Sequence, residues 1–230
     1  MKALLITIDG PSGAGKTTVS RRLAERLGYT YVDTGALYRA VALVALSEGC
    51  APDDDTRLAK ICRHLVLGFE NSSKGPRLYA TCLLVGMDGD DITERIRTPE
   101  IAMFASAVSA RSVVREYLLG VQREMGKGGC VVFEGRDMGT VVFPKADIKF
   151  YLDADLDTRA LRRYEELAAR HAGAGLPEVR EAMKKRDEDD SGRAIAPLRP
   201  AHDAIRIDSM CLEIEQVVEA MLRHIRTQAK

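Results

Sequence analysis

Residues 10 to 17 read Gly10-Pro11-Ser12-Gly13-Ala14-Gly15-Lys16-Thr17 and fit the phosphate-loop pattern G-x-x-x-x-G-K-[ST] at every fixed position. The flanking sequence supports this interpretation, because an apolar stretch at 3–8 precedes the loop and a helical pattern follows it as far as Gly28. Glycines let successive backbone N–H groups turn toward a phosphate chain, and the helix N-terminus adds its positive dipole end. The stretch therefore predicts a nucleoside triphosphate site, with Lys16 at the β- and γ-phosphates and the Thr17 hydroxyl on Mg²⁺.

The composition limits the possible partners. The chain has 230 residues, 46% of them hydrophobic, which is enough to bury the core of one large α/β domain. Its 34 basic residues balance 34 acidic ones, so no overall field attracts it to nucleic acid or to an anionic membrane. No apolar run reaches the length of a membrane span, and the first apolar stretch begins too close to Met1 for a signal peptide. We expect a cytoplasmic protein that binds neither nucleic acid nor membrane.

Cysteine and histidine residues give no sign of a metal site. The five cysteines are scattered and form no C-x-x-C pair, which favours reduced core thiols over disulfides or metal binding. The four histidines are equally dispersed, and we expect each to be a packing or surface residue.

Strand and helix patterns alternate along most of the chain. Buried strands are expected at residues 3–8, 29–32, 130–133, 148–152 and 204–207. Helices are expected after the phosphate loop, at 34–48, after 53–55, at about 99–126, and at the C-terminal end of the chain. This alternation predicts the α/β class, with a parallel sheet covered by helices on both faces and ligands at the carboxyl ends of the strands.

The alternation is interrupted once, between about residues 66 and 97. Strand-like stretches at 67–70 and 77–85 flank a turn at 71–75, which predicts a small antiparallel sheet. We interpret this region as a subdomain inserted into the α/β domain.

Three charged clusters accompany the phosphate loop. Residues 33–39 and 134–140 each follow a predicted strand, and residues 186–193 are expected in a polar loop. Arg39 and Arg136 follow strands on the side of the sheet that carries the phosphate loop, which favours a second phosphate site beside the first.

Residue patterns leave more than one function class open. One is a kinase for a phosphorylated acceptor, another is a kinase for a different small acceptor such as a sugar, and a third is a nucleotide-hydrolysing switch or binding module. The switch lacks support, because the chain has no Asn-Lys-x-Asp motif and residues 137–140 lack the glycine that Asp-x-x-Gly requires.

Taken together, the motifs resemble bacterial cytidylate kinases, which are nucleoside monophosphate kinases among the P-loop kinases. The resemblance runs nearly end to end, through residues 8–16, 33–39, 96–100, 135–144 and 214–217. Its most specific part is the Gly-Arg-Asp-Met-Gly-Thr run at 135–140, which separates this family from adenylate, guanylate and thymidylate kinases.

The resemblance implies an activity and an organisation. The activity is transfer of the γ-phosphoryl of ATP to CMP, and to dCMP, with Mg²⁺ as cofactor. The organisation is a monomeric P-loop kinase domain over residues 1–230 with a five-stranded parallel sheet, a monophosphate-binding insert at about 66–97 and a mobile lid at about 171–197. One departure is Asp189, where some members carry a further arginine.

The resemblance also implies roles for individual residues. The catalytic set is Lys16, Arg136 and Arg193. The ATP-binding set is Gly10, Pro11, Ser12, Gly13, Ala14, Gly15, Lys16, Thr17 and Thr18. The CMP-binding set is Thr34, Arg39, Ser106, Arg115, Arg136, Asp137, Arg186, Asp190 and Arg193. The expected metal ligand is Thr17, and Asp9 and Asp33 are either water-mediated metal contacts or structural hydrogen-bond acceptors.

Within the CMP-binding set, each part of the nucleotide has its own residues. Arg39 and Arg136 are expected on the acceptor phosphate. Ser106, Arg115 and Asp137, with Thr34 nearby, are expected around the cytosine, and Arg186 and Asp190 at the ribose.

Overall fold

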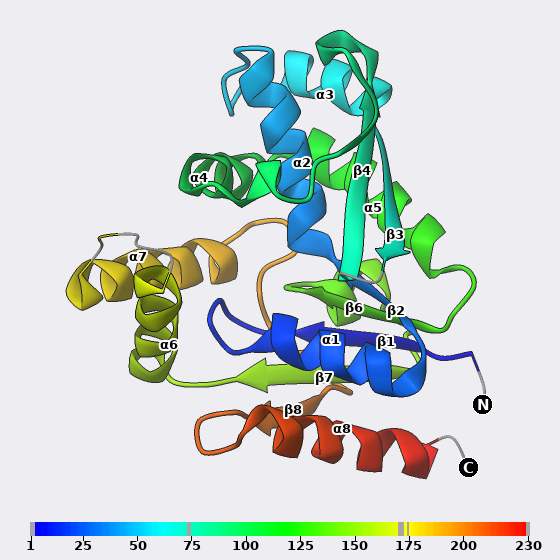
Figure 1. The fold of residues 1–230 in the computed structure, drawn as a ribbon, viewed down its shortest axis with the longest axis vertical. Helices are drawn as coiled ribbons and strands as arrows, with labels where there is room; N and C mark the ends of the chain where they lie inside the picture. Colours follow the sequence, from blue (N-terminus) through cyan, green and yellow to red (C-terminus); the bar gives the residue numbers. More distant parts are fainter. Residues whose placement is uncertain (1–2, 73–74, 170–172, 174, 229–230) are drawn as a thin grey trace. The chain divides into compact units, whose positions relative to one another are not determined.

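The computed structural model describes residues 3–72, 75–169, 173 and 175–228. The chain divides into two compact units (Figure 1). The first comprises Met1–Tyr31 with Gly128–Lys230, and the second comprises Val32–Lys127. Within the described residues, no helix combines the length and the apolar character needed to cross a membrane.

The main sheet has five strands in the order β2-β6-β1-β7-β8. Their bounds are Leu5–Asp9 for β1, Thr30–Asp33 for β2, Val131–Gly135 for β6, Ile148–Asp153 for β7 and Ile205–Asp208 for β8. β1 pairs in parallel with β6 on one side and β7 on the other, and β7 pairs in parallel with β8. The expected five-stranded sheet is confirmed, and β1 lies at its centre, where Ile6 and Ile8 are fully buried.

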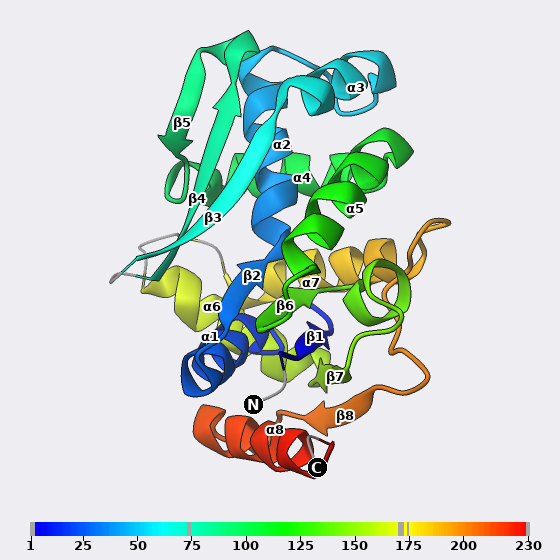
Figure 2. The same ribbon diagram turned by 90° about the vertical axis from the view of Figure 1, so that its right-hand side faces the viewer.

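Helices of the first unit accompany the sheet (Figures 1 and 2). They are α1 (Lys16–Leu27), α6 (Leu156–Ala168), α7 (Leu176–Ser191) and α8 (Ile214–Gln228), with a π-helical turn, η3, at Met138–Val142. Apolar residues of α1 and α8 pack with those of β1 and β7 in one cluster that includes Leu23, Phe150 and Met221. The end of α1 is set by Gly28, whose φ of 67° favours glycine.

The charged stretch at 186–193 corrects one expectation. It was expected as a polar loop, but most of it forms the last turns of α7. Aspartate is a poor helix former, so tertiary contacts decide here: α7 buries Val179 and Met183, and Asp190 accepts from Arg136 and Arg193.

The second unit combines helices with a separate sheet. Its elements are α2 (Thr34–Ser47), α3 (Asp55–His64), β3 (Val66–Ser72), β4 (Gly75–Cys82), η1 (Leu83–Val85), β5 (Met87–Asp91), η2 (Arg95–Arg97), α4 (Pro99–Val108) and α5 (Ser112–Gly126). β4 pairs antiparallel with both β3 and β5, so the expected small antiparallel sheet is present with a third strand. Its own core contains Leu37, Leu58, Leu78 and Leu118.

The helix expected over 99–126 is in fact two helices. The chain leaves α4 at Ser109 and starts α5 after Arg111, whose backbone is extended. Arg111 is fixed by Asp55 of α3, which accepts from its Nε at 2.8 Å and from its Nη2 at 2.6 Å. Because the contact between Arg111 and Asp55 joins residues 56 positions apart, the sequence pattern does not reveal the break.

The thiols are free, as expected, but not all of them belong to the core. Cys50, Cys62 and Cys82 are buried, whereas Cys130 and Cys211 are exposed. Burial raises the pKa of the Cys62 thiol to about 12. His171 lies outside the described residues.

Candidate active site

The phosphate loop joins β1 to α1 and has the backbone that its glycines allow. Gly10, Gly13 and Gly15 have positive φ values of 149°, 76° and 86°. At Gly10 a Cβ would lie 2.0 Å from the carbonyl oxygen of Leu152 on β7, so no other residue fits between the loop and the sheet. The loop therefore starts tightly packed on the neighbouring strand.

The Lys16 side chain is drawn into the loop. It is 4% exposed, and its Nζ donates to the Pro11 carbonyl at 2.6 Å. Burial lowers the pKa of Lys16 to about 7, and the nearby charge of Arg136 acts in the same direction. A bound polyanion would favour the charged form again, so this site is poised for a phosphate chain.

Glu134 is a site residue to which the sequence patterns assigned no role. It lies near the end of β6, the strand beside β1, and its Oε1 accepts from the Thr17 hydroxyl at 2.9 Å. Its Oε2 accepts from the Tyr31 hydroxyl on β2 at 2.5 Å. The available signal was an acidic residue at the carboxyl end of a predicted strand.

The oxygen donors at this point fit a magnesium ion. Mg²⁺ prefers hard oxygen ligands and keeps several waters and phosphate oxygens, so it needs only one or two protein groups. The Thr17 hydroxyl and the Glu134 carboxylate supply such donors next to the phosphate loop. No group of three or more acidic, histidine or cysteine side chains suited to a metal occurs among the residues that the structure describes.

The two aspartates left open by the sequence are both engaged with the protein. Asp9 accepts from the backbone N–H of Met138 at 2.9 Å and of Gly139 at 2.7 Å, which anchors η3. Burial raises the pKa of Asp9 to about 6, although these two bonds act in the opposite direction. Asp33 accepts from the Ala36 N–H at the start of α2 and pairs with Arg39 at 2.8 Å. These contacts are those of structural acceptors.

Two of the three expected catalytic residues converge on one buried carboxylate. Asp190 of α7 has a side chain only 3% exposed, and its Oδ2 accepts from the Arg136 Nε at 2.8 Å. Its Oδ1 accepts from the Arg193 guanidinium. Burial alone would lower the pKa of Arg136, but the carboxylates of Asp190, Glu134 and Asp187 outweigh it and raise the pKa. The same arginines, followed by Arg186, hold the pKa of Asp190 below its usual value against the effect of burial.

This cluster belongs to the same unit as the phosphate loop. The charges of Arg136 and Arg186 both reach Lys16. Arg186 on α7 and Arg136 after β6 therefore both act electrostatically on Lys16 in the loop. The Asp190 carboxylate lies between Arg136 and Arg193. Asp190 was expected at the ribose, and in this structure its carboxylate accepts from Arg136 and Arg193.

Four expected CMP-binding residues lie in the second unit, on three helices. Thr34 begins α2 and is buried, and Arg39 follows it by more than one turn. Arg115 of α5 is 8% exposed, donates to the Ser109 carbonyl at 3.2 Å and lies over the Tyr38 ring. Ser106 on α4 also contacts Ser109, because the Ser106 carbonyl accepts from the Ser109 hydroxyl at 2.7 Å.

These contacts connect two of the expected cytosine residues inside the second unit. Ser106 and Arg115 share Ser109 as a neighbour, at the turn between α4 and α5. Asp137, the third, is a buried residue of the first unit.

A model of the cytidylate kinase family matches residues 6–227. A cytidylate kinase of Geobacter sulfurreducens is 48% identical over 229 residues, which cover 100% of this chain and 95% of that protein. A cytidylate kinase of Geobacter sp. strain M21 is 48% identical over 223 residues, or 97% of this chain and 93% of that protein. The chain belongs to the cytidylate kinase family.

A solved structure agrees on the fold. A shikimate kinase from Bacteroides thetaiotaomicron aligns with a TM-score of 0.50 at 14% identity, over 97% of this chain and 98% of that chain. At this identity the likeness concerns the fold alone. It confirms the P-loop kinase fold that the resemblance implied, and the family match confirms the resemblance to cytidylate kinases.

Proposed function

We propose that this chain transfers the γ-phosphoryl group of ATP to CMP and dCMP, giving ADP and CDP or dCDP. The observation that carries the proposal is the convergence of Arg136 and Arg193 on Asp190, in the unit that holds the phosphate loop. A kinase that joins two polyanions needs positive charge beyond the donor site, and buried arginines suit phosphate oxygens. A switch that only hydrolyses its nucleotide has no need of a second phosphate site.

The chemistry needs no general base, because the attacking oxygen belongs to a phosphate that is ionised at neutral pH. The protein has to align two repelling polyanions and neutralise the charge between them. We assign this task to Lys16, Arg136 and Arg193. Thr17 and Glu134 would hold Mg²⁺, which supplies further charge neutralisation when bound.

Base recognition is proposed to use Ser106, Arg115 and Asp137. Cytosine presents an amine donor at position 4 and acceptors at N3 and O2, so a carboxylate and two donors complement it. Uracil has a donor at position 3 and an acceptor at position 4. The donors of the protein would then face a donor, and the carboxylate would face an acceptor, which disfavours binding. Arg39 would hold the acceptor phosphate, and Arg186 with Asp190 would approach the ribose.

Two regions would serve substrate binding and closure. We propose that the antiparallel sheet of β3, β4 and β5 belongs to the monophosphate-binding insert, and that residues 171–197 form a lid over the phosphates. Residues 171, 172 and 174 lie outside the described residues, and α7 makes up most of the remainder. We further propose that the protein acts in the cytoplasm as a monomer.

A product panel tests the proposed function. The protein is incubated with ATP, Mg²⁺ and one acceptor chosen from CMP, dCMP, UMP, AMP and shikimate, and ADP and phosphorylated products are measured. We expect ADP to form in step with CDP or dCDP, and little ADP without an acceptor. Phosphorylation of shikimate instead would favour another small-acceptor kinase, and ADP formation independent of any acceptor would favour a hydrolysing switch.

A further inference from the structure

Arg159 of α6 lies at a point where three segments of the first unit meet. Its Nε donates to the Ala154 carbonyl at 2.8 Å, and its Nη1 donates to the Ser12 carbonyl of the phosphate loop at 3.0 Å. The same Nη1 lies 2.7 Å from Oδ2 of Asp187 on α7. The Arg159 side chain is 7% exposed, so this guanidinium is enclosed by acceptors rather than by water.

The loop also packs directly on these helices. A Cβ at Gly13 would lie 2.7 Å from Cε of Met183 on α7 and 3.0 Å from the Arg159 carbonyl oxygen. The peptide between Ser12 and Gly13 is thus held on one side by a hydrogen bond and on the other by close packing. A shift of α7 would be felt by this part of the loop.

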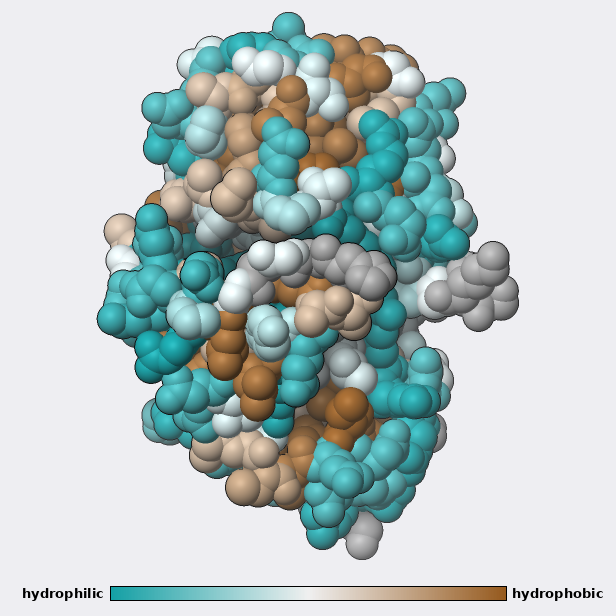
Figure 3. All heavy atoms as spheres, turned by 60° about the vertical axis from the view of Figure 1, so that its left-hand side comes forward, coloured by the Kyte–Doolittle hydropathy of each residue, from teal (hydrophilic) through white to brown (hydrophobic). Residues whose placement is uncertain are grey.

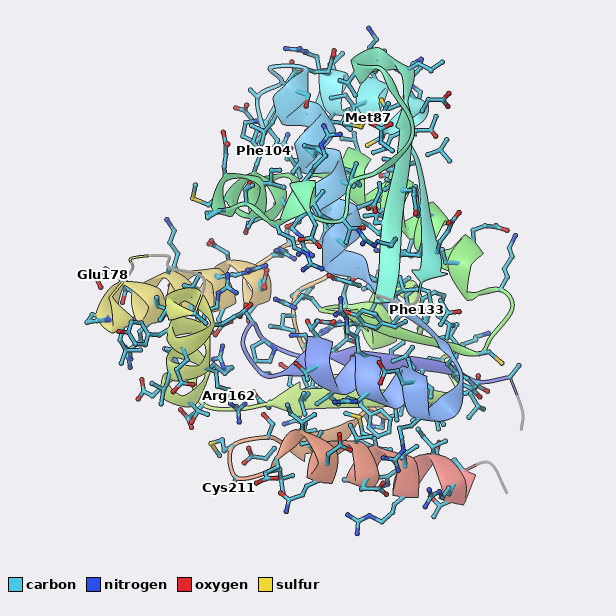
Figure 4. The ribbon with its side chains drawn as sticks, viewed as in Figure 1. Met87, Phe104, Phe133, Arg162, Glu178 and Cys211 are labelled. Carbon is cyan, nitrogen blue, oxygen red and sulfur yellow. The ribbon has the colours of Figure 1, made fainter. Side chains whose placement is uncertain are left out.

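Neighbouring loop carbonyls are held in a similar way. The Lys16 Nζ donates to the Pro11 carbonyl, and the Ser209 hydroxyl donates to the Ala14 carbonyl at 3.1 Å. Ser209 in turn is fixed by Arg162 of α6, which is labelled in Figure 4. With carbonyls held by side chains, the N–H groups of the loop have a fixed orientation for phosphate oxygens. Only the Ser12 carbonyl is held by a residue that is itself paired with α7, among those described.

Asp187 lies close to Asp190 on α7. It precedes Asp190 by three residues, and side chains at this spacing lie on the same face of a helix. One turn of α7 therefore makes two connections. Asp187 pairs with Arg159, which holds the phosphate loop, and Asp190 pairs with Arg136 and Arg193. The Oδ1 atom of Asp187 is buried without a hydrogen-bond partner among the described residues. The helix therefore packs although one oxygen of this carboxylate accepts no hydrogen bond.

We propose that Arg159 and Asp187 are positioning residues for phosphoryl transfer, which set the orientation of the Ser12 peptide according to the position of α7. The loop that binds the donor and the arginines that meet the acceptor are thereby tied to one helical turn. The inference rests on the proposed function, since it concerns transfer between two phosphates. Neither side chain needs to touch a substrate for this role.

The test compares two matched substitutions. Asp187→Asn removes the charge that pairs with Arg159. Asp157→Asn breaks another ion pair between α6 and α7, that of Asp157 with Arg180 at 2.5 Å, which is solvent-exposed and does not contact the loop. For each protein, kcat, the ATP Kd by calorimetry, and the ratio of ADP formed to CDP formed are measured in the presence of CMP and Mg²⁺.

We expect Asp187→Asn to lower kcat by roughly tenfold or more, because misplacement of about 1 Å in an active site can cost up to a hundredfold. The ATP Kd should stay within about twofold of wild type, since the loop N–H groups remain. The ratio of ADP to CDP should rise above the value of one that coupled transfer gives, because a misaligned γ-phosphoryl is lost to water. Asp157→Asn should behave as wild type in all three measurements.

Three results would overturn the inference. One is an unchanged kcat and ratio in Asp187→Asn, and another is an equal loss in Asp157→Asn. A third is a proportional loss of ADP and CDP with a ratio of one, which would show a merely structural role. If Asp187→Asn does not fold, Arg159→Lys carries the same test, because it keeps the charge but loses the guanidinium geometry. A wild-type protein that forms no CDP would refute the proposed function itself, which is a separate result.

Discussion

The two units of this chain use their charged residues differently. In the first unit the ion pairs beside the phosphate loop are buried, with side-chain exposures of 19% and 3% for Arg136 and Asp190. In the second unit the pairs near the expected CMP-binding residues are partly exposed, at 26% each for Arg39 and Asp33, and 34% and 44% for Arg111 and Asp55. Breaking a buried pair leaves an uncompensated charge, whereas exposed pairs contribute little. The buried charges beside the phosphate loop therefore form a fixed electrostatic environment, whereas the partly exposed pairs of the second unit are screened by solvent.

This difference predicts how substitutions divide between the kinetic constants. Changes in the buried network should lower kcat, because its charges act on the transferring phosphoryl. Changes in the second unit should act mainly on CMP affinity and, together with changes at Asp137 of the first unit, on the choice of base. Arg115 is an exception, because it is buried although it lies in the second unit. Its substitution should therefore change both kcat and the choice of base.

The largest effect is expected at Lys16. Lys16→Met should lower kcat by about a hundredfold to a thousandfold, comparable with loss of one preorganised charge-stabilising group. Its unfolding temperature should change little, because the side chain contacts a loop carbonyl rather than the apolar core. Steady-state kinetics with ATP and CMP and a thermal melt check both statements. A folded variant with near-normal turnover would remove Lys16 from the mechanism.

Base selection comes next and tests the division between the units directly. Asp137→Ala should reduce the ratio of kcat/KM for CMP over UMP by about tenfold to a hundredfold, the range for loss of one well-made base contact. The same measurement on Arg115→Met shows whether the second unit shares in reading the base. If Asp137 only orients Arg136, both substrates should suffer alike and the ratio should stay constant.

The sequence was most informative where local chemistry decides the structure. The phosphate loop could be predicted because only glycine fits at positions such as Gly10, and the strands could be predicted because β1 is buried on both faces. The split between α4 and α5 could not, because it depends on Asp55, which lies 56 residues from Arg111. Exposure of Cys130 and Cys211 was missed for a similar reason, since a scattered cysteine carries no sign of its surroundings.

The site divides along the same line. Arg136 and Arg193 were predicted from motifs. That both of them donate to Asp190 could not be predicted, because this contact requires the end of α7 to pack beside the end of β6. The bond between Tyr31 and Glu134 joins residues 103 positions apart and depends on the order of β2, β6 and β1 in the sheet. Arg159 gave no signal at all, because its contacts with Ser12 and Asp187 come from the packing of α6 and α7 on the loop.

The smallest expected effect is a pH dependence of ATP binding that belongs to the first unit alone. Burial, followed by the charge of Arg136, lowers the pKa of Lys16 to about 7 in the free protein. A bound triphosphate restores the charge, so ATP binding above pH 7 should take up close to one proton at Lys16. As pH rises from 7 to 8, the charged fraction of the free lysine falls, and ATP affinity should weaken by up to about tenfold for that reason.

ATP also titrates in this range, and Lys16→Met supplies the baseline for that contribution. Calorimetric titrations of ATP at pH 8, in buffers with different ionisation enthalpies, give the number of protons taken up by each protein. The wild type should exceed the variant by close to one proton. Equal proton uptake would mean that Lys16 is already charged in the free protein at this pH. The buried network of the first unit would then not depress its pKa, and the contrast with the open ion pairs of the second unit would not extend to proton binding.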